Sequence, residues 1–120
     1  MDIEKLQETA RRFIDERDWR QFQTLKELAI NASVESNELL ELFQWQEGKD
    51  IDKKLLSGED KATMDKIKKE TADVFFSCLA IADHAGFDMG KVFLEKIEEL
   101  EKRYQKDKVK GKVVKIPSND

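Results

Sequence analysis

Two acidic phrases, each set in a stretch of helical periodicity, constrain this chain more than any other feature. Glu35-Ser-Asn-Glu38 and Glu70-Thr-Ala-Asp73 both lie among apolar residues that recur at helical spacing. Carboxylates three residues apart share one flank of a helix, because successive residues turn by roughly 100°. Glu35 and Glu70 also border the apolar stripes of their helices, whereas purely solubilising carboxylates more often lie opposite the stripe. If the two helices pack antiparallel, all four carboxylates converge on one spot.

Converging carboxylates repel one another strongly unless a cation lies between them. Oxygen ligands suit a hard divalent cation, which predicts Mg²⁺ with Mn²⁺ as a second candidate. Ser77 and Ala80 continue the flank of Glu70 with small side chains, and we expect them to leave room for a substrate. Two other readings stay open at this point. Acidic pairs are common on solvated helix faces, and a non-enzymatic helical interaction or scaffold module would need no metal.

A ferritin-like di-iron bundle also gathers carboxylates from helices, but it requires two Glu-x-x-His pairs. The single histidine of this chain, His84, does not follow either acidic phrase at that spacing. The di-iron alternative is therefore disfavoured, and His84 is expected to lie at a surface or interface near a helix end.

Length and charge narrow the class of protein further. A chain of 120 residues forms one domain and is short for an enzyme that buries its substrate alone, so partner subunits are expected. A net charge of −4 provides no basic surface for nucleic acid, and no apolar run is long enough for a membrane span. Cys78 falls on an expected buried stripe, which indicates a reducing compartment. The amino terminus lacks a signal-peptide pattern, so we expect a cytoplasmic protein.

Periodicity and capping signals predict four long helices and no strand before the tail. Their expected bounds are Asp2 to residues 15–17, Thr24 to about Gln46, Ser57 or Glu59 to Ala85, and Asp88 to about Lys106. Gly48 and Gly86 are the expected stops of the second and third helices. Residues 49–58 are expected to form a polar connection with a short helical turn. A domain over residues 1–106 is then followed by a flexible basic tail, residues 107–120, which could also pair as a strand or lie across a neighbour.

The third helix carries apolar residues on two faces. Val74 and Cys78 belong to its main stripe, while Phe76 and Leu79 lie on the far side. A helix buried on two sides in so short a domain predicts a homo-oligomer, because a second subunit is the simplest cover for the far face. On the fourth helix the residues expected to point inward are Val92, Phe93, Ile97, Leu100 and Tyr104.

The segment between the first two helices, Arg17 to Gln23, contains Trp19 and Phe22 and has no sustained period. It is expected to be a loop or a broken turn. Aromatic side chains in such a loop either pack on the core of their own domain or form a platform for a flat ligand. The sequence alone leaves both possibilities open.

The run LAINASVESNELLELFQW, from Leu28 to Trp45, resembles the MazG-like all-α nucleoside triphosphate pyrophosphohydrolases, and most closely their dCTP pyrophosphatase branch. The ordered pair of acidic phrases and the loop RDWRQF add to the resemblance, which covers about residues 3–104. It implies a four-helix core assembled as a dimer of dimers. It also implies Mg²⁺-dependent hydrolysis of a nucleoside triphosphate, such as the deoxynucleotide dCTP, to the monophosphate and pyrophosphate.

The same resemblance implies residue roles. The metal-binding and catalytic set would be Glu35, Glu38, Glu70 and Asp73, and the substrate-binding set would be Trp19, Phe22, Gln23, Lys26, Trp45, Lys96 and Arg103. In the second set the two tryptophans would flank the base, and the three cationic residues would lie near the phosphates.

Three positions depart from the family pattern. Leu100 stands where many members carry asparagine, and Gln105 where many carry proline. Gln23 stands where cytosine-preferring members often have histidine, so the sequence leaves the base preference open.

Overall fold

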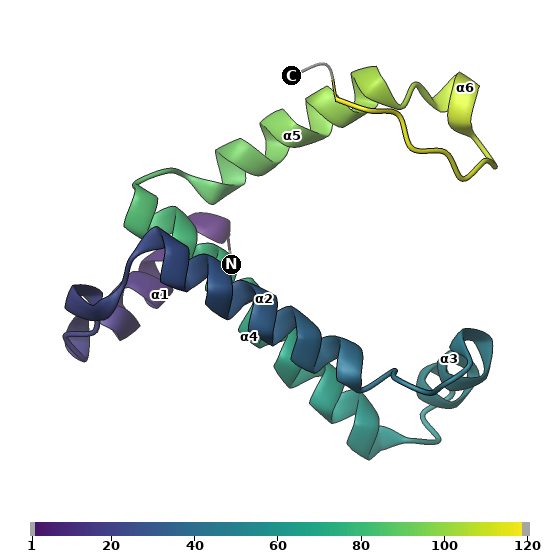
Figure 1. Ribbon diagram of the computed structural model, residues 1–120, viewed down its shortest axis with the longest axis horizontal. Coiled ribbons are helices and arrows are strands. Elements are labelled where there is room, and N and C mark those ends of the chain that lie inside the picture. Colours follow the sequence, from purple (N-terminus) through teal and green to yellow (C-terminus); the bar gives the residue numbers. More distant parts are fainter. Residues whose placement is uncertain (1, 119–120) are drawn as a thin grey trace.

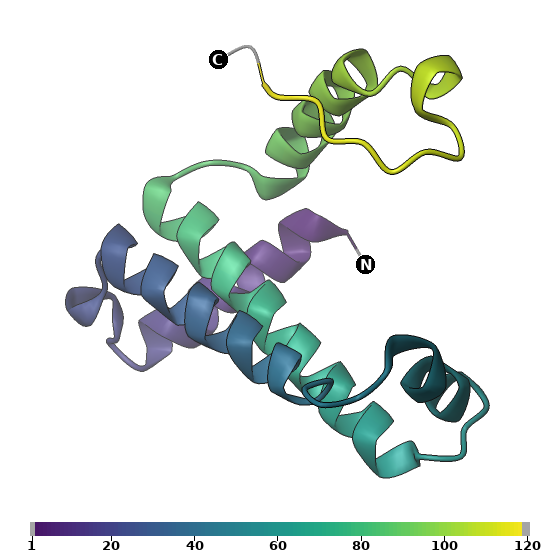
Figure 2. The same ribbon diagram turned by 45° about the vertical axis from the view of Figure 1, so that its right-hand side comes forward.

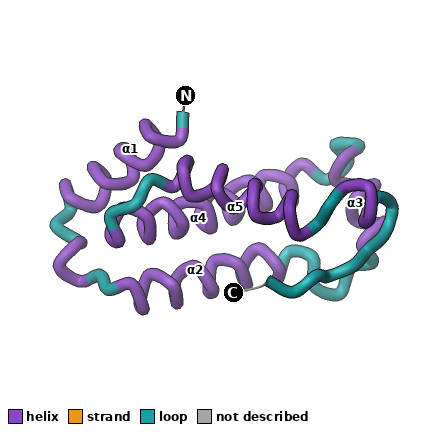
Figure 3. Tube along the Cα trace, turned by 90° about the horizontal axis from the view of Figure 1, so that it is seen from above, coloured by secondary structure: helices purple, strands orange, loops and turns teal. Residues whose placement is uncertain are grey.

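Helices joined by short loops make up the described part of the chain, residues 2–118, in a computed structural model (Figure 1). The elements are α1 Ile3–Glu16, the 3₁₀ turn η1 Arg20–Phe22, α2 Leu25–Glu41, α3 Gly48–Leu56, α4 Lys61–Ala85, α5 Met89–Arg103 and α6 Lys106–Val109. Figure 3 shows only helix and loop over these residues, which confirms the all-α class. None of the helices among residues 2–118 is both long and apolar enough to cross a membrane.

Side-chain caps begin three of the long helices where the sequence predicts them. The side chains of Asp2, Thr24 and Asp88 each accept a hydrogen bond from the backbone N–H three residues ahead, at 2.9, 3.2 and 3.1 Å. Such a bond satisfies one of the free N–H groups of the first helical turn. Gly86 ends α4 in the left-handed conformation, with φ of 80°, as expected of a glycine at that position.

The connection between α2 and α4 differs from the prediction. Helix α2 ends at Glu41, and the left-handed residue that follows is Trp45, with φ of 68°, rather than Gly48. Gly48 instead opens α3, where the side chain of Glu47 accepts the N–H of Asp50 at 2.9 Å. Asp60, and not Ser57 or Glu59, caps α4. The predicted end of α2 was wrong because glycine usually takes the left-handed conformation after a helix, whereas here Trp45 takes it.

Helix α4 is the central element, packed between α1 and α2 (Figure 3). The small core joins Ile14 of α1, Leu28 of α2 and Ala80 of α4. Ser77 and Ala80 are both buried, so the space predicted beside them is occupied by the packed helices. Small side chains on this flank therefore allow close helix packing rather than a substrate cavity.

Two residues of α4 lie in surroundings opposite to those predicted, whereas Phe76 of the far face stays 37% exposed and Ala82 of the main stripe is buried. Leu79, expected to meet a second subunit, is 4% exposed and lies beside α1, where the rings of Phe13 and Phe76 pack edge to face at 5.7 Å. Cys78, expected in the core, is exposed together with Thr71. The prediction was wrong because α1 and α2 cover the flanks of the main stripe and leave its centre open.

Helix α5 leaves the other helices just after Gly86 (Figure 1, Figure 2). Gln7 of α1 holds the start of α5, because its Nε2 donates to the carbonyl of Phe87 at 2.8 Å and its Oε1 accepts the N–H of Met89 at 3.1 Å. Beyond this clamp no residue of α5 is buried, so its expected inward face is uncovered. The radius of gyration is 17.6 Å, whereas a compact domain of this length has about 14 Å.

The segment after α5 turns back toward that helix (Figure 2). The hydroxyl of Tyr104 accepts the N–H of Ile116 at 3.1 Å and donates to its carbonyl at 3.3 Å. The expected tail therefore has a definite contact with the end of α5.

Candidate metal centre and substrate site

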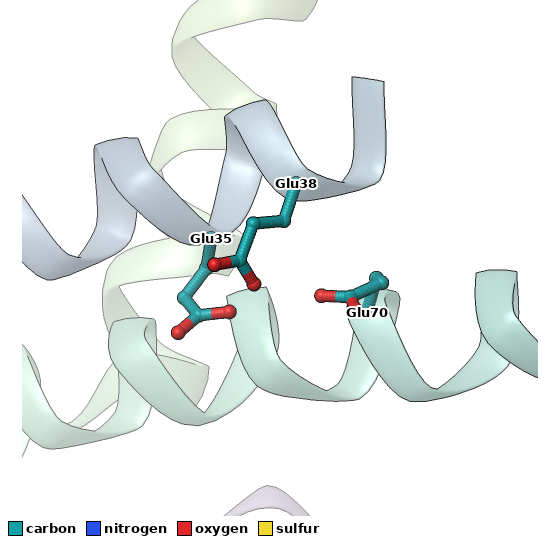
Figure 4. A group of neighbouring side chains, drawn as sticks. All are labelled: Glu35, Glu38 and Glu70. Carbon is teal, nitrogen blue, oxygen red and sulfur yellow. The ribbon is translucent and has the colours of Figure 1, made fainter. Parts of the chain in front are cut away.

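Three of the four predicted carboxylates meet between α2 and α4. The two helices run antiparallel, so Glu35 and Glu38 of α2 face Glu70 of α4 (Figure 4). One carboxylate oxygen from each side chain lies within 4.8 Å of the other two. The three-residue spacing on α2 thus places both of its carboxylates on the side that faces α4, as the sequence indicated.

The donor atoms of this cluster fit a hard divalent cation. Oε2 of Glu35 and Oε2 of Glu70 are buried without a hydrogen-bond partner. Within residues 2–118, none of the three carboxylates forms an ion pair with a lysine or arginine. Buried acceptors without partners are unfavourable, and oxygen ligands gathered from two helices would be satisfied by Mg²⁺ or Mn²⁺.

The protonation of the cluster reflects its crowding. Burial raises the pKa of Glu35 first, and the neighbouring Glu38, Asp73 and Glu70 carboxylates raise it further. Burial likewise raises the pKa of Glu70, with Glu38 and Asp73 as the next causes. Both effects disfavour the charged form, so a bound cation and the ionised carboxylates would stabilise one another.

Asp73 lies next to this cluster without joining it. Its side chain is exposed, and it contributes to an apolar groove of about 590 Å³ between α1 and α4 that also includes Phe13 and Phe76. Its charge is nevertheless close enough to raise the pKa of Glu35 and Glu70. The role of Asp73 as a ligand stays a prediction.

The predicted aromatic residues lie in two separate places. Trp19 and Phe22 are both exposed in the η1 loop, where the ring of Trp19 meets that of Phe13 edge to face at 5.7 Å. Trp19 therefore rests on α1 and also presents surface to solvent, and its role as a platform for a flat ligand stays a prediction. Trp45 is 92% exposed in the turn after α2.

The predicted polar contacts differ in their surroundings. Lys26 is exposed near the start of α2, and Oε1 of Gln23 is buried without a hydrogen-bond partner. Lys96 and Arg103 are on α5, where both pair with Glu99, Arg103 at 3.4 Å. Because α5 diverges from α2 and α4, the chain does not bring its own Lys96 and Arg103 to its own carboxylate cluster (Figure 1).

One charged network was missed by the sequence analysis. Asp83 of α4 has a side chain only 3% exposed, and its Oδ1 and Oδ2 each accept from a guanidinium at 2.6 Å, Arg11 and Arg20 respectively. Burial alone would raise the pKa of Asp83, but the hydrogen bonds of Arg11 and Arg20 outweigh it and hold the pKa below its usual value. An acidic residue about one helical turn after Leu79 and two turns after Phe76, on the same apolar face, was the available signal.

The antiparallel helices α2 and α4 bring together carboxylates that have no cationic partner. The chain is therefore an all-α protein with an acidic site suited to a divalent cation. The family is given by the sequence: residues 30–115 match the MazG-like family. The chain belongs to that family, which confirms the resemblance noted from the two acidic phrases.

Curated relatives and one solved structure add detail. The chain is 28% identical over 102 residues to dCTP pyrophosphatase 1 of Bos taurus, covering 85% of this chain and 59% of that protein. It is 28% identical over 102 residues to dCTP pyrophosphatase 1 of Homo sapiens, covering 85% and 58%. It thus spans about three fifths of the length of these relatives. The crystal structure of a pyrophosphatase from Archaeoglobus fulgidus DSM 4304 matches with a TM-score of 0.72 and 33% identity, over 85% of this chain and 91% of that one.

Proposed function

We propose that this chain hydrolyses a nucleoside triphosphate between its α and β phosphates, giving the monophosphate and pyrophosphate. The observation that carries the proposal is the cluster of Glu35, Glu38 and Glu70, in which one buried oxygen of Glu35 and one of Glu70 lack partners. Membership of the MazG-like family and the names of the relatives support the same activity. A deoxynucleotide such as dCTP is the substrate that these relatives suggest.

The three glutamates, with Asp73 beside them, would hold the cation, with Mg²⁺ as the expected ion and Mn²⁺ as the alternative. When bound, the cation would neutralise phosphate charge and make a water molecule more acidic. Oε2 of Glu35 is buried without a partner, so this carboxylate is the candidate to accept a proton from the attacking water. Lys26 is the cationic residue of the same chain nearest in sequence to the carboxylates of α2, and would bind phosphate.

We further propose that the working form is a homo-oligomer, a dimer at least and a dimer of dimers by resemblance. The open stripe of α4 around Cys78 and the uncovered face of α5 support this, since both would bury apolar surface against another copy. A second copy could also bring Lys96 and Arg103 to a carboxylate cluster that they do not reach within one chain. The four-helix core would then be completed between chains.

The activity is tested by incubating the purified protein with Mg²⁺ and a panel of canonical and modified nucleoside triphosphates. Release of pyrophosphate, and not of orthophosphate, is the expected result, with at least one deoxynucleotide preferred. A calorimetric titration with Mg²⁺ distinguishes the enzyme from the scaffold alternative, because a scaffold should bind no Mg²⁺ at the glutamates. Absence of both hydrolysis and Mg²⁺ uptake would refute the proposal.

Trp45 provides a test of base recognition. A non-glycine residue in the left-handed region costs roughly 1–2 kcal/mol, and Trp45 has φ of 68° with its ring in solvent. Trp45→Gly should therefore keep or raise the free energy of unfolding. It should weaken nucleotide binding by roughly 1–3 kcal/mol if the ring stacks on the base.

Calorimetry with a non-hydrolysable triphosphate and thermal melting measure the two effects separately. Trp45→Ala is the matched control, because it removes the ring and keeps the backbone strain. Unchanged affinity in both variants would show that Trp45 does not contact the base.

A further inference from the structure

The Asp83 network joins the aromatic loop to the helices. Arg20 is the first residue of η1, and its guanidinium contacts two carboxylates on different elements. Its Nε donates to Oδ1 of Asp15 at 2.8 Å, near the end of α1, and its Nη2 donates to Oδ2 of Asp83 at 2.6 Å, near the end of α4. A planar guanidinium bound at two edges fixes both the position and the orientation of the residue that carries it.

The other restraints tie the loop to itself or to α1: Gln21 bonds to Asp18, and the ring of Trp19 packs edge to face on Phe13 at 5.7 Å. No residue of η1 is buried, and Asp18, just before it, takes the left-handed conformation with φ of 52°. The N–H of Trp19 bonds to the carbonyl of Ile14 at 3.2 Å, which holds only the beginning of the turn. The side chain of Arg20 is therefore the main tie between the middle of the loop and α4.

Arg20 lies in the chain between the two loop residues that are predicted to bind substrate, Trp19 and Gln23. Trp19 precedes it, and the N–H of Gln23 bonds to the carbonyl of Arg20 at 3.1 Å. Oε1 of Gln23 is a buried acceptor without a partner. One loop thus carries an exposed aromatic ring and an unused acceptor, the groups that a flat ligand with N–H donors, such as a nucleobase, would need.

We propose that Asp83 and Arg20 are positioning residues that hold Trp19 and Gln23 in place for recognition of the nucleobase. This inference rests on the proposed function, since it assigns these residues to the same substrate. Neither Asp83 nor Arg20 touches the substrate in this scheme. Asp83 acts through Arg20, and its second partner, Arg11, binds its other carboxylate oxygen.

Two variants test the proposal. Asp83→Asn weakens the acceptor for both guanidiniums, and Arg20→Lys keeps a positive charge but loses the rigid planar fork that reaches Asp15 and Asp83 from two edges. The side chain of Arg20 is partly exposed, so Arg20→Lys should fold even if the buried Asp83→Asn does not. Glu16→Gln is the matched control, because it removes only surface ion pairs, with Arg12 at 3.8 Å and with Arg17 at 3.9 Å.

Steady-state kinetics should show KM raised about tenfold, in the range found when a residue supporting a binding site is lost, with kcat nearly unchanged. A second readout uses Trp19 fluorescence in a Trp45→Phe background, where Trp19 is the only tryptophan. Acrylamide should quench Trp19 more strongly in Asp83→Asn and Arg20→Lys than in Glu16→Gln or the parent chain.

Unchanged quenching together with unchanged KM in a folded Arg20→Lys variant would overturn the inference, as would a lowered melting temperature without either effect. Should the parent chain hydrolyse no triphosphate, the proposed function fails on its own. In that case the quenching of Trp19 still decides whether Asp83 and Arg20 hold the loop.

Discussion

Replacing Glu38 with glutamine is expected to lower pyrophosphate release by on the order of 100- to 1000-fold, the loss typical when one electrostatic group is removed from a reaction site. The metal-free melting temperature should stay the same or rise. Glu38 raises the pKa of both Glu35 and Glu70, so its charge is unfavourable to the folded chain without a cation. Neutralising it removes a ligand and relieves that repulsion together.

Calorimetry with Mg²⁺ should show weaker uptake by the Glu38→Gln variant, and Glu8→Gln on the exposed face of α1 serves as the control. Near-normal pyrophosphate release by Glu38→Gln at saturating Mg²⁺ would show that the cluster is not the reaction site. Asp73→Asn examines the remaining member of the predicted set, which lies beside the three glutamates.

The pH dependence of stability provides an independent check on the same carboxylates. The folded-state pKa of Glu35 and of Glu70 is raised, so their ionised forms destabilise the folded metal-free chain above the ordinary glutamate pKa. As the pH falls through the raised values, protonation relieves the repulsion. The stability advantage of Glu38→Gln over the parent chain should therefore shrink with decreasing pH and disappear when Mg²⁺ is present.

Local signals in the sequence were sufficient for the helices and for most of the metal cluster. Capping residues such as Thr24 and Asp88 act through bonds within a few residues, and Glu35 and Glu38 need only helical spacing to share a flank. Their meeting with Glu70 required one assumption, that the two helices pack antiparallel. The structure confirms that assumption (Figure 1).

Features that depend on long-range packing could not be read in the same way. Periodicity shows that α4 is apolar on two faces, but it does not show which face α1 will cover. For this reason Cys78 and Leu79 were assigned to the wrong surroundings. The Asp83 network could not be predicted because its partners Arg11 and Arg20 lie more than sixty residues away in the chain.

Helix α5 has apolar residues that its own chain does not cover. Val92, Phe93 and Ile97 point away from any core of their own chain and are exposed. The centre of the main apolar stripe of α4, around Cys78, is likewise exposed. Two uncovered apolar surfaces in one short chain are both accounted for if copies of the chain pack together.

Phe93→Asp is therefore expected to dissociate the assembly. Burying a phenylalanine contributes roughly 1.5–3 kcal/mol, and a buried unpaired carboxylate adds a further penalty, so the dissociation constant should rise by about 1000-fold. Light scattering should give a multiple of 14.0 kDa for the parent chain and a single-chain mass for the variant. Lys91→Asp is the control, since the first turn of α5 tolerates an acidic residue on its polar side.

Cys78, the only cysteine, reports on the α4 stripe in the same experiment. It should react slowly with a thiol reagent in the assembled parent chain and rapidly in Phe93→Asp. Pyrophosphate release should fall with dissociation, because Lys96 and Arg103 would no longer reach a carboxylate cluster on another copy. A parent chain that stays at 14.0 kDa at micromolar concentration would refute the assembly. An assembled chain with freely reactive Cys78 would instead limit the interface to α5.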